Sequence, residues 1–357
     1  MPISWWCRNR DKENFCKCIR HIQKYVGGMS MPDSVKTFLS HASYEKVKTG
    51  NVVSTSDEND VIEAIINKQD CILFGPPGTS KTYMIDRIHE YLGDKTGLVK
   101  IVQFHANYTY EEFIEGIVPD TDKGGFKIEP GVFYKFCEDA KKLKEESPDK
   151  ICVFVIDEIN RANVTAVFGE ILNLMEDKGV RKMETPKLHK EFWIPDNVVI
   201  VGTMNTADKT LAKLDFAFRR RFRFLPVFPS KIILHKMISA NGFDTEAKLT
   251  VDEYVTCFEV LNTKIARHPL LGKNLTLGHV LWTKKNDNTP YTKKDIGRIF
   301  RETIFAQIES YCGSNKDALG NLLGIEIRDK ILYGYEISDE EIISYLNGLK
   351  NSKVVNA

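Results

Sequence analysis

One short run combines an apolar segment, a glycine-proline turn and a lysine-threonine pair, the residue types that bind a nucleotide phosphate. After the apolar residues 71–74, it reads Gly75, Pro76, Pro77, Gly78, Thr79, Ser80, Lys81 and Thr82. In a P-loop of this kind, backbone N–H groups hold the α- and β-phosphates, the lysine reaches the β- and γ-phosphates, and the threonine hydroxyl binds Mg²⁺. A turn before a helix could arise by chance, but the apolar run, loop, Lys-Thr pair and helical pattern agree. We therefore predict that residues 75–82 bind a nucleoside triphosphate with Mg²⁺.

One position departs from the pattern G-x-x-x-x-G-K-[ST], because Ser80 stands where the second glycine is expected. Serine is small enough for the backbone to approach a phosphate, but dihedrals that only glycine adopts are excluded for it. The helix after the loop is expected to place Met84, Ile85 and Ile88 on one face and to end at Gly93.

A second apolar run, residues 151–156, ends in two acids, Asp157 and Glu158. Charged residues rarely follow a buried strand without a partner. We predict that Asp157 holds Mg²⁺ together with Thr82, and that Glu158 is the general base for the attacking water. The alternative is that the two acids only cap the helix that follows.

A third apolar run, residues 198–203, is followed by Asn205. At the carboxyl edge of a parallel sheet this amide would face the same crevice as the P-loop, where it could orient water without adding charge.

Arg219, Arg220 and Arg221 precede the last apolar run. An arginine can neutralise charge that develops on the γ-phosphate. Three successive arginines cannot all face one site, so we expect at most two to contribute.

The elements that position these residues alternate between two patterns. The β-rich runs are 71–74, 98–104, 151–156, 198–203 and 222–227. Helical patterns separate most of them, for example the apolar residues Phe168, Ile171, Leu172 and Met175. This alternation predicts an α/β fold in which a doubly wound parallel sheet is covered on both faces. Residues 124–131 predict a small hairpin.

After Pro229 only helical patterns are found. They cover residues 230–240, 251–267 and 292–311, and a last helix is capped by Ser338 with Glu341 three residues on. We expect a mostly helical accessory segment at 1–50. A P-loop core should follow at 51–228, and a smaller all-helical lid domain at 229–357.

Composition excludes some partners. With a net charge of only +1, the chain has no overall electrostatic field that would attract nucleic acid or a membrane surface. No apolar run approaches the roughly 18 residues that span a bilayer, and the N-terminus lacks the apolar region of a signal peptide. A cytoplasmic location is therefore expected.

Of the eight cysteines, Cys71 and Cys152 lie in strand-like runs. Cys16 and Cys18 lack a second metal-binding pair, so reduced thiols are favoured over zinc.

Several segments together resemble the AAA+ core of the McrB-like NTPases, within the MoxR and dynein-related group. They are GPPGTSKT, VQFHANYTYEEFIEG, VFVIDEINRAN, FGEILNLME, VGTMNTADKT and DFAFRRRF, in order from about Val61 to Phe224. Leu277, Gly278 and His279 resemble a short lid motif of that family. The family pattern has arginine where this chain has Lys209.

The resemblance implies a ring, usually a hexamer, that binds nucleotide between subunits. Lys81, Thr82, Asp157, Glu158 and Asn205 would act within one subunit. Arg220 and Arg221 would be offered to the neighbouring subunit's nucleotide, with Arg219 the least certain of the three. McrB itself uses GTP, but most AAA+ relatives use ATP, and we expect ATP here.

The function implied is that of a motor subunit in an McrBC-like DNA restriction or defence complex. The chain shows no nuclease signature and no large DNA-recognition domain before residue 50. We therefore expect an McrC-like nuclease partner and indirect DNA contact. The alternatives are a MoxR-like chaperone ATPase that remodels a protein, and a slowly hydrolysing nucleotide switch.

Overall fold

The structure is a computed structural model that describes residues 58–208, 214–284 and 289–352. The predictions for residues 1–50, including Cys16 and Cys18, and for Lys209 fall outside these ranges.

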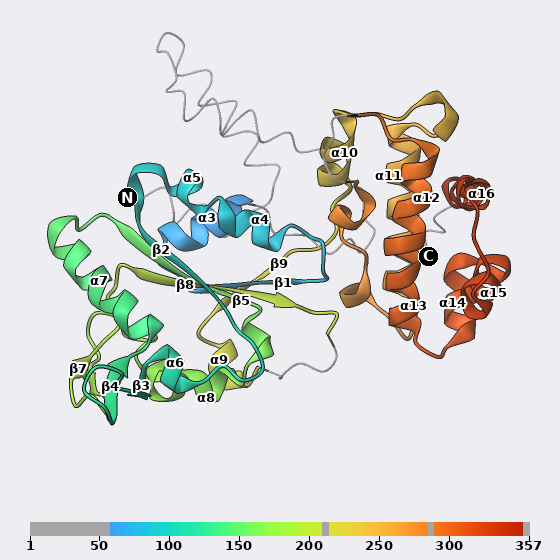
Figure 1. Ribbon diagram of the computed structural model, residues 1–357. Helices are drawn as coiled ribbons and strands as arrows, with labels where there is room; N and C mark the ends of the chain where they lie inside the picture. The colour runs from blue at the N-terminus through green and yellow to red at the C-terminus, as the bar shows by residue number, and fades with distance from the viewer. Residues whose placement is uncertain (1–57, 209–213, 285–288, 353–357) are drawn as a thin grey trace, which may run out of the picture. The chain divides into compact units, whose positions relative to one another are not determined.

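Five parallel strands form the central sheet in the order β2-β5-β8-β1-β9 (Figure 1). Their bounds are β1 Cys71–Gly75, β2 Thr96–Gln103, β5 Ile151–Asp157, β8 Val198–Asn205 and β9 Arg223–Pro226. Each lies within two residues of the run that predicted it. The three inner strands are almost wholly buried, as expected where helices cover both faces of a parallel sheet. The predicted α/β fold is confirmed.

Helices cover the sheet on two sides (Figure 1). The side chains of β5 alternate between these two faces. Val153 and Val155 belong to the cluster on one face, whereas Phe154 and Ile156 belong to the cluster on the other. The first face carries α3 Glu58–Ile66, α4 Lys81–Asp86 and α5 Ile88–Leu92, and the second carries α7 Val132–Glu146, α8 Val164–Phe168 and α9 Phe216–Arg219. This period of two is the pattern of a strand that is buried on both faces.

Two predicted helices differ from the observed ones. The helix after the P-loop is interrupted at Arg87, whose φ of −96° and ψ of 5° separate α4 from α5, and it ends at Gly93 as predicted. The pattern over residues 168–175 is helical only in part. Gly169 has a φ of 51°, so α8 ends there and a 3₁₀ segment, η4 Gly169–Asn173, follows.

Shorter elements lie between the strands of the core. They are η2 Gly93–Lys95, α6 Tyr110–Phe113, β3 Glu115–Pro119, β4 Phe126–Pro130, η3 Ile159–Arg161, β6 Met183–Glu184 and β7 Glu191–Phe192. β3 and β4 form an antiparallel hairpin whose turn contains Gly124 and Gly125 at positive φ. It begins earlier than the predicted range 124–131, because its first strand starts at Glu115. β6 and β7 form a second, shorter antiparallel pair.

In the C-terminal helical region, residues 231–351, the regular elements of the described residues are helices, as predicted, apart from one isolated bridge between Phe243 and Tyr291. Its elements are α10 Lys231–Ser239, η5 Thr245–Ala247, α11 Val251–Arg267, η6 Lys273–Leu275, η7 His279–Trp282, α12 Lys293–Ile299, η8 Phe300–Phe305, α13 Ala306–Cys312, α14 Lys316–Leu323, α15 Ile325–Tyr333 and α16 Asp339–Asn351. The predicted helix at 292–311 contains a π-helical segment, η8. The capping box of Ser338 and Glu341 is present. The patterns above do not include α14 and α15, which have only 8 and 9 residues.

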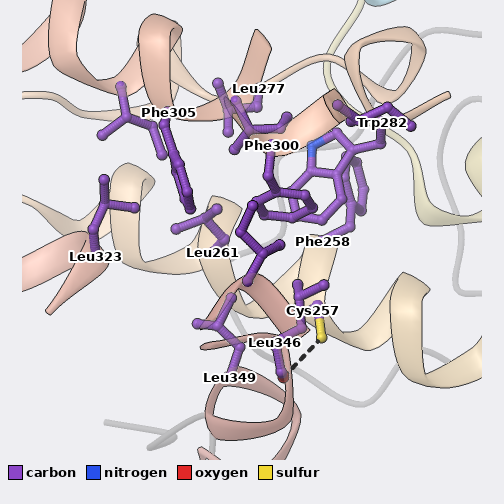
Figure 2. Packing of buried hydrophobic residues seen from close by; sticks show 14 of the residues in the cluster. Cys257, Phe258, Leu261, Leu277, Trp282, Phe300, Phe305, Leu323, Leu346 and Leu349 are labelled. Atoms are coloured by element: carbon purple, nitrogen blue, oxygen red, sulfur yellow. Dashed lines mark hydrogen bonds between the residues drawn. The ribbon is translucent and has the colours of Figure 1, made fainter. Parts of the chain in front are cut away.

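One hydrophobic cluster holds this region together. Figure 2 shows Phe258, Trp282, Phe300 and Leu346 among its members, with the Cys257 thiol 3.2 Å from the Leu346 carbonyl oxygen. The ring of Trp282 meets Phe258 and Phe300 edge to face, an arrangement that favours the quadrupoles of both rings.

The described ranges contain five of the eight cysteines. Cys71 and Cys152 are buried and free, as are Cys137, Cys257 and Cys312. Within these ranges no cluster of three or more His, Cys, Asp or Glu side chains is arranged to hold a metal ion. None of the helices that the structure describes has both the length and the apolar character needed to cross a membrane.

Candidate nucleotide site

The predicted P-loop joins the carboxyl end of β1 to the start of α4. Gly75 pairs with Asn205 of the neighbouring strand β8, so the loop begins beside that amide. Gly75 must lack a side chain, because a Cβ there would lie 2.0 Å from the carbonyl oxygen of Val227. Gly78 has a φ of 73°, which glycine adopts readily. The path of the loop thus requires glycine at position 75 and favours it at position 78.

Ser80 is where the local prediction and the structure differ most. Its φ of 67° and ψ of 21° lie in the left-handed region. Non-glycine residues visit this region at a cost of roughly 1–2 kcal/mol. The serine therefore adopts a conformation that glycine favours, instead of avoiding it as expected. Something else in the structure must offset the cost.

The backbone of the loop is arranged to receive an anion. Within the described ranges, the N–H groups of residues 78–82 have no hydrogen-bond acceptor. Buried or half-buried N–H groups are normally paired. A row of unpaired donors around a turn is the arrangement that binds phosphate oxygens in backbone nests.

Lys81 lies within this loop, and its ammonium is only poorly hydrated. It is 6% exposed, and Nζ donates to the carbonyl oxygens of Gly75 at 3.0 Å and Pro76 at 2.8 Å. Burial lowers the pKa of Lys81 to about 8, while the carboxylates of Glu158 and Asp157 act in the opposite direction. Ionised phosphate oxygens form stronger hydrogen bonds with such a cation than carbonyl groups do.

The two acids and the amide predicted to complete the site come together at the ends of β5 and β8. Thr203 links the acids, because its hydroxyl donates to Asp157 and accepts from the backbone N–H of Glu158 at 3.0 Å. The Asn205 amide donates to Oε1 of Glu158. Glu158 has a φ of 54° and a ψ of 44°, and its side chain makes no helix-capping hydrogen bond. Such backbone strain is concentrated at functional sites.

Two further polar residues at this edge were not among the predicted site residues. Arg161 places Nε 3.4 Å from Oε2 of Glu158, which is buried and accepts no hydrogen bond from the described residues. The Asn160 amide donates to the backbone oxygen of Asn205 at 3.3 Å. Their position directly after the two acids was the available signal. Glu158 is thus held by an amide on one oxygen and faces a guanidinium with the other.

The donor set fits Mg²⁺. Thr82 follows Lys81 at the start of α4 and is exposed, so its hydroxyl is accessible. Asp157 is partly exposed, and its carboxylate is close enough to Lys81 to act on the pKa of that ammonium. Hard oxygen ligands of this kind, completed by water and substrate phosphate, are those that Mg²⁺ uses in nucleotide sites.

The structure does not bring Arg220 and Arg221 to the P-loop of the same chain. Both pair with Glu176, at 2.9 Å and 3.1 Å. Together with Asp70, the residue before β1, these three line a cavity of about 480 Å³. Because β1 runs from this end of the sheet towards the P-loop, the arginines lie at the amino edge and the loop lies at the carboxyl edge.

The three successive arginines differ in their surroundings. The guanidinium of Arg219 lies over the ring of Phe224, 5.0 Å from its centroid. The side chain of Arg220 is 65% exposed, whereas that of Arg221 is only 5% exposed and donates to the carbonyl oxygen of Ala217. Of the two that pair with Glu176, Arg220 is the one whose charge is accessible to another molecule.

Comparison with known proteins finds one matching domain family and two similar restriction-enzyme components. Residues 70–222 match the AAA domain of the dynein-related subfamily. The chain is 38% identical over 235 residues to the type IV methyl-directed restriction enzyme EcoKMcrB subunit of Escherichia coli strain K12. The aligned residues cover 61% of this chain and 48% of that subunit. It is 28% identical over 296 residues to the type II restriction enzyme BsuMI component YdiS of Bacillus subtilis strain 168, which covers 68% of this chain and 86% of that component.

The chain thus spans about half the length of the Escherichia coli subunit that it matches. The P-loop follows β1, Asp157 and Glu158 lie at the end of β5, and Asn205 ends β8. Residues 70–222 match the AAA domain of the dynein-related subfamily, and the chain is similar over 61% of its length to an McrB subunit.

Proposed function

We propose that this protein hydrolyses a purine nucleoside triphosphate at the β–γ bond, with ATP as the expected substrate and GTP as the alternative. The observation that carries the proposal is the Asn205–Glu158 hydrogen bond, formed at the strand edge where Lys81 and the unpaired N–H groups of the P-loop lie. We take residues 51–228 as the hydrolysing core and residues 229–357 as its lid.

Each residue has a chemical task in this reaction. The N–H groups of the loop bind phosphate oxygens, and Lys81 exchanges its two carbonyl partners for the β- and γ-phosphates. Oε1 of Glu158 is held by Asn205, which leaves Oε2 to accept a proton from the attacking water. Asn205 also limits where that water can lie. Thr82 and Asp157 would hold Mg²⁺, which neutralises charge on the phosphate oxygens when bound.

We further propose that the protein acts as a ring, with six subunits expected. Arg220 and Arg221 lie at the sheet edge opposite the P-loop, so they can serve a nucleotide only in a neighbouring subunit. Arginine supplied across an interface stabilises charge in the transition state of phosphoryl transfer.

The biological setting that we propose is a restriction or defence complex in the cytoplasm. Its support is the similarity to two proteins that are named as restriction-enzyme components. In that setting the chain is the motor subunit, an McrC-like nuclease subunit is its partner, and DNA contact is indirect. This similarity favours the restriction role over the chaperone role.

One experiment tests the core of the proposal. Purified protein is titrated with ATP and with GTP in the presence of Mg²⁺, and phosphate release is followed for the wild type, Glu158→Gln and the control Glu145→Gln. Glu145 is exposed on α7 and outside the site. We expect Glu158→Gln to bind nucleotide normally and to lose about 10²–10⁴-fold in turnover. Turnover by this variant at the rate of the control would refute the role of Glu158.

A further inference from the structure

Ser80 contacts a segment of the C-terminal helical region that the proposed reaction does not use. This contact segment, residues 277–282, is fixed at both ends: Leu277 and Trp282 are fully buried in the cluster shown in Figure 2. The Asn262 side chain bonds to both the N–H and the carbonyl of Leu277, and the Tyr254 hydroxyl donates to the carbonyl of Trp282. The segment is therefore held rigidly against its own domain.

The middle of the contact segment lies directly on the P-loop. The N–H of Val280 donates to the carbonyl oxygen of Gly78 at 3.0 Å. A Cβ on Gly278 would lie 2.1 Å from that same carbonyl, so no larger residue fits there. His279 completes the contact, with Nε2 2.8 Å from the hydroxyl oxygen of Ser80.

The partners of His279 determine which nitrogen carries the proton. The backbone N–H of Ser230 donates to Nδ1 at 3.4 Å, so Nδ1 is the acceptor and Nε2 carries the hydrogen. His279 is fully buried, and burial lowers its pKa to about 4, with Lys81 adding to the effect. At neutral pH the imidazole is therefore uncharged, and it donates from Nε2 to Ser80.

We infer that His279 is a positioning residue that holds Ser80, through this hydrogen bond, in the left-handed conformation on which the P-loop's phosphate-binding geometry depends. The inference rests on the proposed nucleotide binding. Glycine would adopt the same conformation without assistance, so the histidine offsets the cost of having a serine at this position. The C-terminal helical region thereby contributes to nucleotide affinity through the loop itself.

The test measures the affinity of the full-length protein for ADP and GDP with Mg²⁺ by calorimetry. His279→Asn keeps an acceptor near Nδ1 but loses the donor to Ser80, whereas His279→Gln keeps a donor near Nε2. We expect His279→Asn and Ser80→Ala each to bind about fivefold more weakly than wild type, the factor for a hydrogen bond of about 1 kcal/mol. His279→Gln should recover most of the loss, and Ser80→Gly provides the background in which the effect of His279 is measured again.

The decisive variant combines Ser80→Gly with His279→Asn. If His279 acts through Ser80, the second substitution should no longer weaken binding once glycine is present. A fivefold loss that persists in the glycine background would overturn the inference and assign His279 a general structural role. Ser80→Ala removes the same hydrogen bond without changing the histidine, so the test remains valid if a histidine variant does not fold. Unchanged affinity in Ser80→Ala would also overturn the inference. Absence of nucleotide binding by the wild type would instead refute the proposed function, and the inference with it.

Discussion

The burial of His279 predicts how the stability of the protein depends on pH. The pKa of this imidazole is lowered from its ordinary 6.5 to about 4, because burial removes it from water and Lys81 is nearby. Between these values the unfolded chain binds a proton that the folded chain excludes, so the free energy of unfolding decreases as pH falls. At ~1.4 kcal/mol per pH unit, the difference amounts to about 3 kcal/mol. Its contribution is fully present above pH 6.5 and is lost as pH falls to about 4.

The assay is urea unfolding of wild type and His279→Gln at intervals from pH 7 to pH 4. Tryptophan fluorescence is a suitable signal, because Trp282 lies three residues from His279 in the same buried cluster. Glutamine does not titrate in this range, so the difference in slope between the proteins isolates the histidine from all other groups. We expect the wild type to lose about 3 kcal/mol more than the variant. Parallel curves would refute the neutral, buried state of His279 that the hydrogen bond to Ser80 requires.

Two further predictions concern charge at the nucleotide. Lys81→Ala should weaken nucleotide binding itself, and because the pKa of Lys81 is lowered to about 8, wild-type affinity should fall as pH rises through that value. Calorimetry at pH 7 and pH 9 checks this, and affinity in Lys81→Ala equal to wild type would contradict it. Substitution of both Arg220 and Arg221 by alanine should reduce turnover by roughly 10³–10⁵-fold and leave binding intact. Mixing this variant with Glu158→Gln should restore partial activity, and co-assembled rings without recovery would argue against a shared site.

The strands and their polar ends could be predicted because the signal is local. Each inner strand is a continuous apolar run, and the run stops where the strand reaches the carboxyl edge of the sheet. A parallel sheet then brings those ends together whatever the connections between them. Asp157, Glu158 and Asn205 were therefore placed correctly beside the P-loop from the sequence, although only the structure gives the hydrogen bonds that join them.

The conformation of Ser80 could not be predicted in the same way. Local propensity places serine outside the left-handed region, and the residue that stabilises the observed conformation, His279, is 199 positions away. The interruption at Arg87 and the 3₁₀ segment after Gly169 have a related cause, because helical periodicity alone does not show where a helix stops. Tertiary contacts decide such details.

The proposed ring follows from where the two halves of the chemistry lie. The P-loop, its unpaired N–H groups and Glu158 lie at the carboxyl edge of the sheet, whereas Arg220 lies at the amino edge with its charge exposed. A contact that joins two different surfaces of the same protein is head-to-tail, and such contacts close into rings when the rotation between subunits allows. A two-fold dimer could supply the arginine to both nucleotides only if one surface patch held both the P-loop and Arg220, and these lie at opposite edges of the sheet. If hydrolysis needs Arg220, assembly in a ring is the arrangement that supplies it to every site.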